Sequence, residues 1–278
     1  MPGLLAFHAH PDDESISMGG TLAEYASSGV RVTVVTATRG EAGEIHNRED
    51  AEQVRPILGE IREAEERAAC AVLGVEDIVF LGFRDSGMMG TDDNSHGDSF
   101  WGADFMDAVG RLVRVIRSRR PDVVTAYDPF GGYGHPDHIQ VHRVGTAAFF
   151  AAADFGRFPL EPGEEPWQPA RLYWATWSRE RMRSVRRQMA TDLGADGEPE
   201  EPSSGTLPDH ITTRRDVSAF LDRKHDALLC HETQFAADSW IRAMPRERLS
   251  QFLGEEVFVR VFSTAPGDPS NPDLFSGL

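Results

Sequence analysis

The stretch that most constrains this chain is an apolar run near its start that ends in a turn rich in histidine and acids. Residues 4–7 read Leu-Leu-Ala-Phe, and residues 8–14 read His-Ala-His-Pro-Asp-Asp-Glu. An apolar run of this length predicts a buried strand whose polar end lies at the edge of a sheet. Neighbouring carboxylates there repel one another unless a cation lies among them. Histidine and aspartate at three-residue spacing could supply two ligands to one metal ion, although the acids could instead cap the next helix.

A second stretch, at residues 131–138, repeats this pattern and favours the metal. It reads Gly-Gly-Tyr-Gly-His-Pro-Asp-His and follows a predicted strand at 123–127. We therefore predict His10, Asp13 and His138 as the metal ligands. Two neutral imidazoles and one carboxylate leave coordination positions open for water, which is typical of a catalytic rather than a structural site.

The order of predicted elements indicates an α/β fold. Strands at 4–7, 31–38, 78–81 and 123–127 alternate with helices at 17–28, 57–73 and 104–119, and a buried helix is expected around 144–153. This alternation predicts a Rossmann-like three-layer sandwich with a mostly parallel sheet, in which ligands bind beyond the carboxyl ends of the strands. The turn after the first strand lacks Gly-x-Gly-x-x-Gly and is crowded with acids, so it would repel a dinucleotide's pyrophosphate.

The second half of the chain is less regular. We expect strands at 171–176 and 256–263, a helix at 216–230, and a basic helix at 178–189 whose arginines form a solvated face. The stretch 194–205, rich in Gly, Pro, Glu and Ser, is expected to be a flexible loop. We predict a single domain over 1–278, with a core at 1–155 that carries the metal site and a C-terminal elaboration at 156–278 on the substrate side.

Composition excludes several classes of partner. The chain has 278 residues and a net charge of −17, which argues against nucleic acid because such affinity depends on cationic side chains. Neither an apolar run of membrane-spanning length nor a basic leader is present, so we expect a cytoplasmic enzyme. The two cysteines, Cys70 and Cys230, are expected to be buried thiols. Homo-oligomer formation is left open.

The two His-Pro-Asp stretches resemble the signatures of the LmbE/PIG-L family of zinc-dependent N-deacetylases. Within that family the chain is most similar to the enzymes that act on mycothiol-type pseudodisaccharides, namely biosynthetic deacetylases and S-conjugate amidases. The likeness extends through Arg-Gly-Glu-Ala-Gly-Glu at 39–44, Arg-Asp-Ser-Gly-Met at 84–88 and Ala-Asp-Phe-Gly-Arg-Phe-Pro at 153–159. It reaches His-Glu-Thr-Gln at 231–234 and Asp-Leu-Phe at 273–275, so it covers nearly the whole chain.

Several catalytic roles follow for residues beside the ligands. Asp12 is placed to act as general base toward a water that the metal activates. His135 could face the same cavity and, when protonated, stabilise the oxyanion or give a proton to the leaving amine. We expect Asp137 to orient His135 and raise its pKa. The resemblance implies the same roles and adds Tyr133 as a hydrogen-bond donor to the oxyanion.

Residues that contact the substrate are implied mainly by the resemblance. Arg62 is a surface arginine by its spacing, yet the family likeness implies that it faces the pocket. Asp85 matches the family's ligand to a sugar hydroxyl, and Glu41 and Glu44 lie on a loop at the rim, where sugar contact is expected.

Three further polar residues near the two motifs are given supporting roles. We interpret His8 as a packed core histidine, since the family motif uses only the second histidine of the first stretch. His142, four residues after His138, and Glu14 are interpreted as residues around the metal ligands rather than as ligands.

The function that these residues imply is metal-dependent removal of an N-acyl group from a glucosamine-containing small molecule, with zinc or else ferrous iron as the cofactor. Residues 84–88 and 133–134 are more similar to the deacetylases. Residues 155–159 and 166–167 are more similar to the S-conjugate amidases, yet Met18 stands where the amidase-type enzymes often carry a lysine. The choice between deacetylase and S-conjugate amidase therefore stays open. A metal phosphoesterase and a non-catalytic sugar-binding module are the alternatives. The first usually requires two metals and more carboxylates, and the second does not require a spare base.

Overall fold

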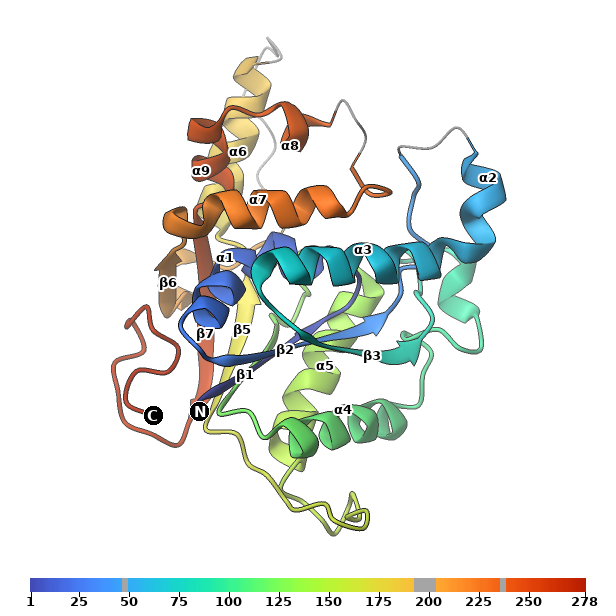
Figure 1. Ribbon diagram of the computed structural model, residues 1–278, viewed down its shortest axis with the longest axis vertical. Helices are drawn as coiled ribbons and strands as arrows, with labels where there is room; N and C mark the ends of the chain where they lie inside the picture. Colours follow the sequence, from blue (N-terminus) through green and yellow to red (C-terminus); the bar gives the residue numbers. More distant parts are fainter. Residues whose placement is uncertain (47–49, 193–203, 236–238) are drawn as a thin grey trace.

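A seven-stranded sheet in the order β3-β2-β1-β4-β5-β7-β6 forms the centre of the protein (Figure 1). The computed structural model describes residues 1–46, 50–192, 204–235 and 239–278. Strands β1 to β5 run parallel, whereas β7 is antiparallel to β5 and β6 is antiparallel to β7. The strand bounds are β1 Gly3–His8, β2 Arg31–Thr38, β3 Asp77–Phe83, β4 Val123–Tyr127, β5 Arg171–Thr176, β6 Thr213–Asp216 and β7 Glu255–Ser263.

Helices cover both faces of the sheet and complete the predicted three layers (Figure 1). One face carries α1 Asp13–Ser27, α3 Leu58–Leu73 and α7 Leu221–Cys230, and the other carries α4 Phe105–Arg119 and α5 Pro136–Ala151. The remaining α-helices are α2 Ala51–Val54, α6 Arg179–Asp192, α8 Trp240–Ala243 and α9 Arg246–Leu253. The predicted fold class is confirmed.

Strand β1 lies at the point where the order of the parallel strands reverses. It pairs with β2 on one side and with β4 on the other, and all of its residues are buried. The connection from β1 passes over one face of the sheet and the connection from β4 over the other, so the loops after these strands diverge and leave a crevice. Both His-Pro-Asp stretches lie at this crevice, which explains how residues 10–13 and 135–138 meet.

Most element boundaries agree with expectation, and the differences have physical causes. Helix α1 begins at Asp13 rather than at residue 17. Helix α5 begins at Pro136, because proline suits the first turn of a helix. Gly74 ends α3 at φ 83°, the left-handed conformation that glycine tolerates. Strand β6 and helices α8 and α9 were not predicted, since they are short. Residues 194–203 of the loop expected at 194–205 lie outside the described residues.

Two expectations about side chains are wrong. Arg181 in α6 is not solvated, because its guanidinium reaches the backbone carbonyls of Glu255 and Ser250. Cys70 is buried as expected, but Cys230 is only half-buried. Within the described residues, none of the helices is long and apolar enough to cross a membrane.

Candidate active site

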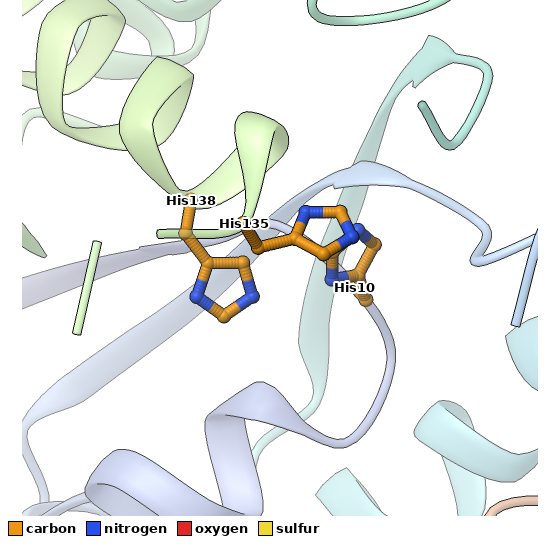
Figure 2. A group of neighbouring side chains, drawn as sticks. All are labelled: His10, His135 and His138. Atoms are coloured by element: carbon orange, nitrogen blue, oxygen red, sulfur yellow. The ribbon is translucent and has the colours of Figure 1, made fainter. Parts of the chain in front are cut away.

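The side chains of both His-Pro-Asp stretches converge at the carboxyl edge of the sheet. His10 comes from the turn after β1, whereas His135 and His138 come from the start of α5 (Figure 2). Nitrogen atoms of these three imidazoles lie within 4.8 Å of one another. All three histidines are buried, with between 5% and 7% of their surface exposed, so the cluster has little bulk water around it.

One carboxylate joins two of these imidazoles at distances that suit a shared metal ion. Asp13 Oδ2 lies 3.5 Å from His10 Nδ1 and 3.3 Å from His138 Nε2. Ligand atoms about 2.1 Å from a tetrahedral ion lie about 3.4 Å apart. The other ring nitrogen of His138 is 3.1 Å from the Gly131 carbonyl, while Nε2 is buried without a hydrogen-bond partner. Both distances from Asp13 Oδ2 therefore match the spacing of two ligands of one divalent ion.

The far nitrogen of His10 is supported by two acids. Nε2 lies 3.2 Å from Asp137 Oδ2 and 3.4 Å from Asp85 Oδ1. Carboxylates in this position fix the imidazole's orientation and make its opposite nitrogen a better metal ligand. The expectation that Asp137 orients His135 is therefore wrong, because its carboxylate contacts His10 and accepts from the backbone N–H and hydroxyl of Ser86.

Asp12 has a strained backbone and a buried arginine partner. Its φ is 107°, a left-handed conformation that costs a non-glycine residue about 1–3 kcal/mol. Arg62 donates to the carbonyl of Pro11 at 2.6 Å and lies 3.2 Å from Asp12 Oδ2. Burial raises the pKa of Asp12 to about 6, although Arg62 opposes this shift. The arrangement holds a carboxylate that titrates near neutrality, as a general base requires.

The position of Arg62 corrects the interpretation of its spacing. Only 3% of the residue is exposed, so it is not a surface arginine. Its guanidinium also donates to the carbonyl of Gly40 at 2.9 Å, and a side chain at Gly40 or Gly43 would collide with it. The glycines of residues 39–44 thus let the loop after β2 approach Arg62 closely.

The surroundings of His135 favour its neutral imidazole form. Its Nδ1 accepts a hydrogen bond from the backbone N–H of Asp137 at 3.2 Å, so Nε2 carries the proton in the neutral ring. Burial, together with His10 and His138, lowers the pKa of His135 to about 3. The expectation of a raised pKa and a protonated ring is therefore wrong. A neutral His135 could still donate one hydrogen bond from Nε2.

The remaining predicted site residues divide into those near the cluster and those away from it. Tyr133 is half-exposed, and its ring centroid lies 4.8 Å from that of His138. Glu41 is partly buried and accepts from the backbone N–H of Asp85 at 3.1 Å. The side chain of Glu44 is 84% exposed and pairs with His46, so the structure does not bring it to the cluster.

Of the three residues given supporting roles, His8 and Glu14 lie in the interior and His142 is partly buried. His8 is fully buried and its Nδ1 lies 2.8 Å from the Tyr127 hydroxyl, which agrees with a packed core histidine. His142 Nδ1 lies 3.0 Å from the carbonyl of Tyr127, so it supports the loop after β4. Glu14 is fully buried 2.9 Å from His231 Nε2, which links α1 to the end of α7.

Sequence reasoning did not assign roles to Ser86, His231 or Trp177. Ser86 positions Asp137, His231 contacts Glu14, and Trp177 lines a cavity beside the cluster. Ser86 and His231 lie in the stretches 84–88 and 231–234 that carry the family resemblance, and this position was the sequence signal that could have identified them. Trp177 follows a predicted strand but belongs to neither motif.

Comparison with known proteins decides the family. Residues 5–149, more than half of the chain, match the family model described as PIG-L: GlcNAc-PI de-N-acetylase. The chain belongs to the PIG-L family. A 1D-myo-inositol 2-acetamido-2-deoxy-alpha-D-glucopyranoside deacetylase from Thermobifida fusca is 45% identical over 91% of this chain and 89% of the relative. As a PIG-L protein, the chain is a hydrolase that removes an N-acyl group from a glucosamine-containing molecule, which decides against the phosphoesterase and binding-module alternatives.

Solved structures support the fold alone. An N,N'-diacetylchitobiose deacetylase from Pyrococcus horikoshii superimposes with a TM-score of 0.64 at 23% identity, covering 93% of this chain and 83% of that one. A 4-carboxy-2-hydroxymuconate hydratase from Pseudomonas putida superimposes with a TM-score of 0.59 at 19% identity, covering 96% and 99%. Because a hydratase shares the fold, the likeness to these solved structures carries no argument about the reaction.

Proposed function

We propose that this PIG-L protein hydrolyses the N-acetyl group of 1D-myo-inositol 2-acetamido-2-deoxy-α-D-glucopyranoside, rather than acting as an S-conjugate amidase. The relative described above carries that name at 45% identity. The observation that carries the proposal is the position of Asp13 Oδ2 between His10 and His138, with Asp12 on the adjoining cavity wall. The products are acetate and the free amine of the sugar.

The proposed metal ligands are His10, Asp13 and His138. Asp85 and Asp137 contact Nε2 of His10, the ring nitrogen that faces away from Asp13. Zinc is the proposed ion, because two imidazoles and a carboxylate are the ligand set of catalytic zinc sites, and ferrous iron is the alternative. When bound, the ion supplies a Lewis acid that lowers the pKa of water to about 7 and polarises the acyl oxygen.

Asp12 moves the protons of the reaction. Ionised above its pKa of about 6, it accepts a proton from the water that attacks the acyl carbon. It then returns a proton to the sugar nitrogen as the C–N bond breaks, so that the amine leaves neutral. Arg62 keeps the carboxylate in place through the contact at 3.2 Å and favours its charged form.

His135 and Tyr133 are the proposed donors to the oxygen that gains negative charge. The neutral His135 has its proton on Nε2, because Nδ1 already accepts from the backbone N–H of Asp137. Tyr133 keeps its hydroxyl proton at neutral pH, since partial loss of solvent around the ring, together with the negative charge of Asp13, raises its pKa above its usual value. Donors that are in place before the reaction stabilise such an oxyanion without reorganising.

Glu41 is the proposed contact to the sugar hydroxyls, since it lies at the rim beside Asp85. Arg62 and Asp85, which were expected to share this role, are buried and contact Asp12 and His10. Glu44 contacts the sugar only if its loop rearranges on binding. A cytoplasmic location, the single-domain division and the oligomeric state remain predictions.

A substrate panel tests the proposal. Zinc-loaded protein should release amine from the inositol glycoside with a higher kcat/KM than from free N-acetylglucosamine, because the aglycone adds binding energy that the free sugar lacks. A pseudodisaccharide S-conjugate with a cysteinyl amide should react more slowly than the inositol glycoside. A preference for the S-conjugate would identify an amidase instead, and no release from any of the three would refute the deacetylase.

A further inference from the structure

A small cavity opens directly from the proposed metal ligands toward strand β5. Its volume is about 180 Å³, and Asp12, Asp13 and His138 form its polar side. The opposite wall is the end of β5 and the residues that follow it, Ala175, Thr176 and Trp177. The cavity therefore begins where the acyl carbon must lie during hydrolysis, and neither Glu41 nor Asp85 lines it.

Its size and lining suit the acyl group of the substrate rather than the sugar. Pockets for drug-sized ligands measure about 300–1000 Å³, so 180 Å³ is small for a pseudodisaccharide. Ile16, Ala175 and Trp177 give it apolar surface, on which sugar hydroxyls would lose hydrogen bonds. This assignment rests on the proposed function, since it requires an N-acyl substrate.

Trp177 is a firmly held part of the wall. Its indole lies against Gly132, where a side-chain carbon would come within 2.8 Å of the indole Cδ1. The Trp177 carbonyl accepts a hydrogen bond from the Thr206 backbone N–H at 2.8 Å. The preceding Thr176 donates to Asp128 Oδ2 at 2.6 Å. These contacts fix the chain on both sides of the indole, so its position is defined.

More space lies behind this wall. A constriction of about 20 Å³ shares Thr176 and Trp177 with the acyl cavity, and Arg181 and Lys224 line its other side. An open groove of about 520 Å³ follows, which shares Arg181 and Glu255 with the constriction. The three spaces thus form a series that runs from the metal ligands to the surface beside α6 and α9.

We propose that Trp177 sets the length of acyl chain that the enzyme accepts, by closing the acyl cavity off from the constriction and the groove behind it. With tryptophan in place, acetyl fits and longer chains meet the indole. A smaller residue at 177 joins the cavity to the space behind it, and an acyl chain of several methylenes can then extend toward the groove.

The test measures kcat/KM by amine release from N-acetyl-, N-butanoyl- and N-hexanoylglucosamine. One methylene that a hydrophobic pocket cannot accommodate costs about 10–200-fold. Wild type should therefore favour acetyl over butanoyl by at least about tenfold. In Trp177→Ala, the ratio of kcat/KM for the acetyl substrate to kcat/KM for the hexanoyl substrate should fall by at least about tenfold. Trp177→Leu keeps more of the packing, so it should lower this ratio less. It replaces the alanine variant in the test if that variant does not fold.

Trp174→Ala is the matched control. Trp174 lies three residues earlier, but its ring packs against His142 and its indole N–H donates to Thr146, so its loss should leave the acyl ratio unchanged. If folded Trp177 variants still deacetylate but show the wild-type ratio of kcat/KM for acetyl to longer acyl substrates, the inference is wrong and the proposed function stands. A wild type that releases no amine from the inositol glycoside of N-acetylglucosamine either would instead refute the function itself.

Discussion

At the residue scale, the proposed chemistry depends on surroundings that favour an ionised Asp12 and a neutral His135. Arg62 contacts the Asp12 carboxylate, whereas His135 is buried beside two other imidazoles and accepts a backbone N–H. The carboxylate is thus favoured as a base and the imidazole as a neutral donor. The sequence had instead predicted a protonated His135 beside an ionised Asp12, with Asp137 raising the pKa of His135.

The first prediction concerns Arg62. Because its charge lowers the pKa of Asp12, Arg62→Met should raise that pKa. Asp12 must be ionised to accept a proton, so the acidic limb of the kcat/KM profile should move to higher pH and the loss of rate should be larger at pH 6 than at pH 8. Arg67→Met is the control, since Arg67 lies on the same helix but is exposed and pairs with Glu63. An acidic limb that did not move in Arg62→Met would disconnect Arg62 from the base.

The second prediction concerns His135. Removing one preorganised oxyanion donor costs about 10²–10³-fold in kcat, so His135→Ala should lose that much and His135→Gln, which keeps an N–H, should recover part of it. Because the pKa of His135 is lowered to about 3, neither variant should change the basic limb of the pH profile. A basic limb that disappeared in both variants would show that His135 acts as a protonated acid after all.

At the scale of elements, sequence reasoning recovered the parallel strands and the antiparallel strand β7 but missed the edge strand β6. Apolar strands such as β1 and β4 carry a clear pattern, whereas β6 reads Thr-Arg-Arg-Asp and gives no hydrophobic signal. Its residues pair with β7, a contact between distant segments that local pattern cannot predict.

The sequence located the residues that meet at the candidate site but not the contacts around them. The motifs locate His10, Asp13 and His138 by their own residues, and the structure brings these three together. The partners of Arg62 are carbonyls of Pro11 and Gly40, and every residue has a carbonyl, so sequence cannot single them out. Asp137 reaches His10 because Ser86, 51 residues away, turns its carboxylate there.

The third prediction concerns the contact that ties helix α7 to strand β7. Lys224 Nζ lies 2.6 Å from Glu256 Oε1, and both side chains are almost fully buried. Breaking a buried pair by removing one partner costs about 3–5 kcal/mol, because the other charge is left uncompensated. Lys224→Met should therefore lower the free energy of unfolding by about that amount in chemical denaturation.

Arg223→Met is the matched control for this prediction. Arg223 lies next to Lys224 on α7 but is exposed and donates to Ser27, so its loss should change the free energy of unfolding by less than about 0.5 kcal/mol. Equal effects of the two substitutions would show that the buried pair does not hold α7 against the sheet.

At the scale of the whole molecule, the site is made by the topology of the sheet. The reversal of strand order at β1 and β4 brings the two His-Pro-Asp stretches to one crevice, although 125 residues separate His10 from His135. Strand β5 adds the wall with Trp177, and α7 adds His231 behind α1. The first half therefore supplies the proposed chemistry, and the second half shapes the space around it.

The measurement that tests the central claim most directly compares wild type with Asp12→Asn, each loaded with one equivalent of zinc, on the inositol glycoside of N-acetylglucosamine. Acetate and amine are quantified together, and bound metal is measured in the same samples. Wild type should release equal amounts of both products, and a chelator should abolish the release. Asp12→Asn should keep its metal yet turn over about 10²–10⁴-fold more slowly. Full turnover by metal-loaded Asp12→Asn, or equal rates with and without metal, would contradict this account.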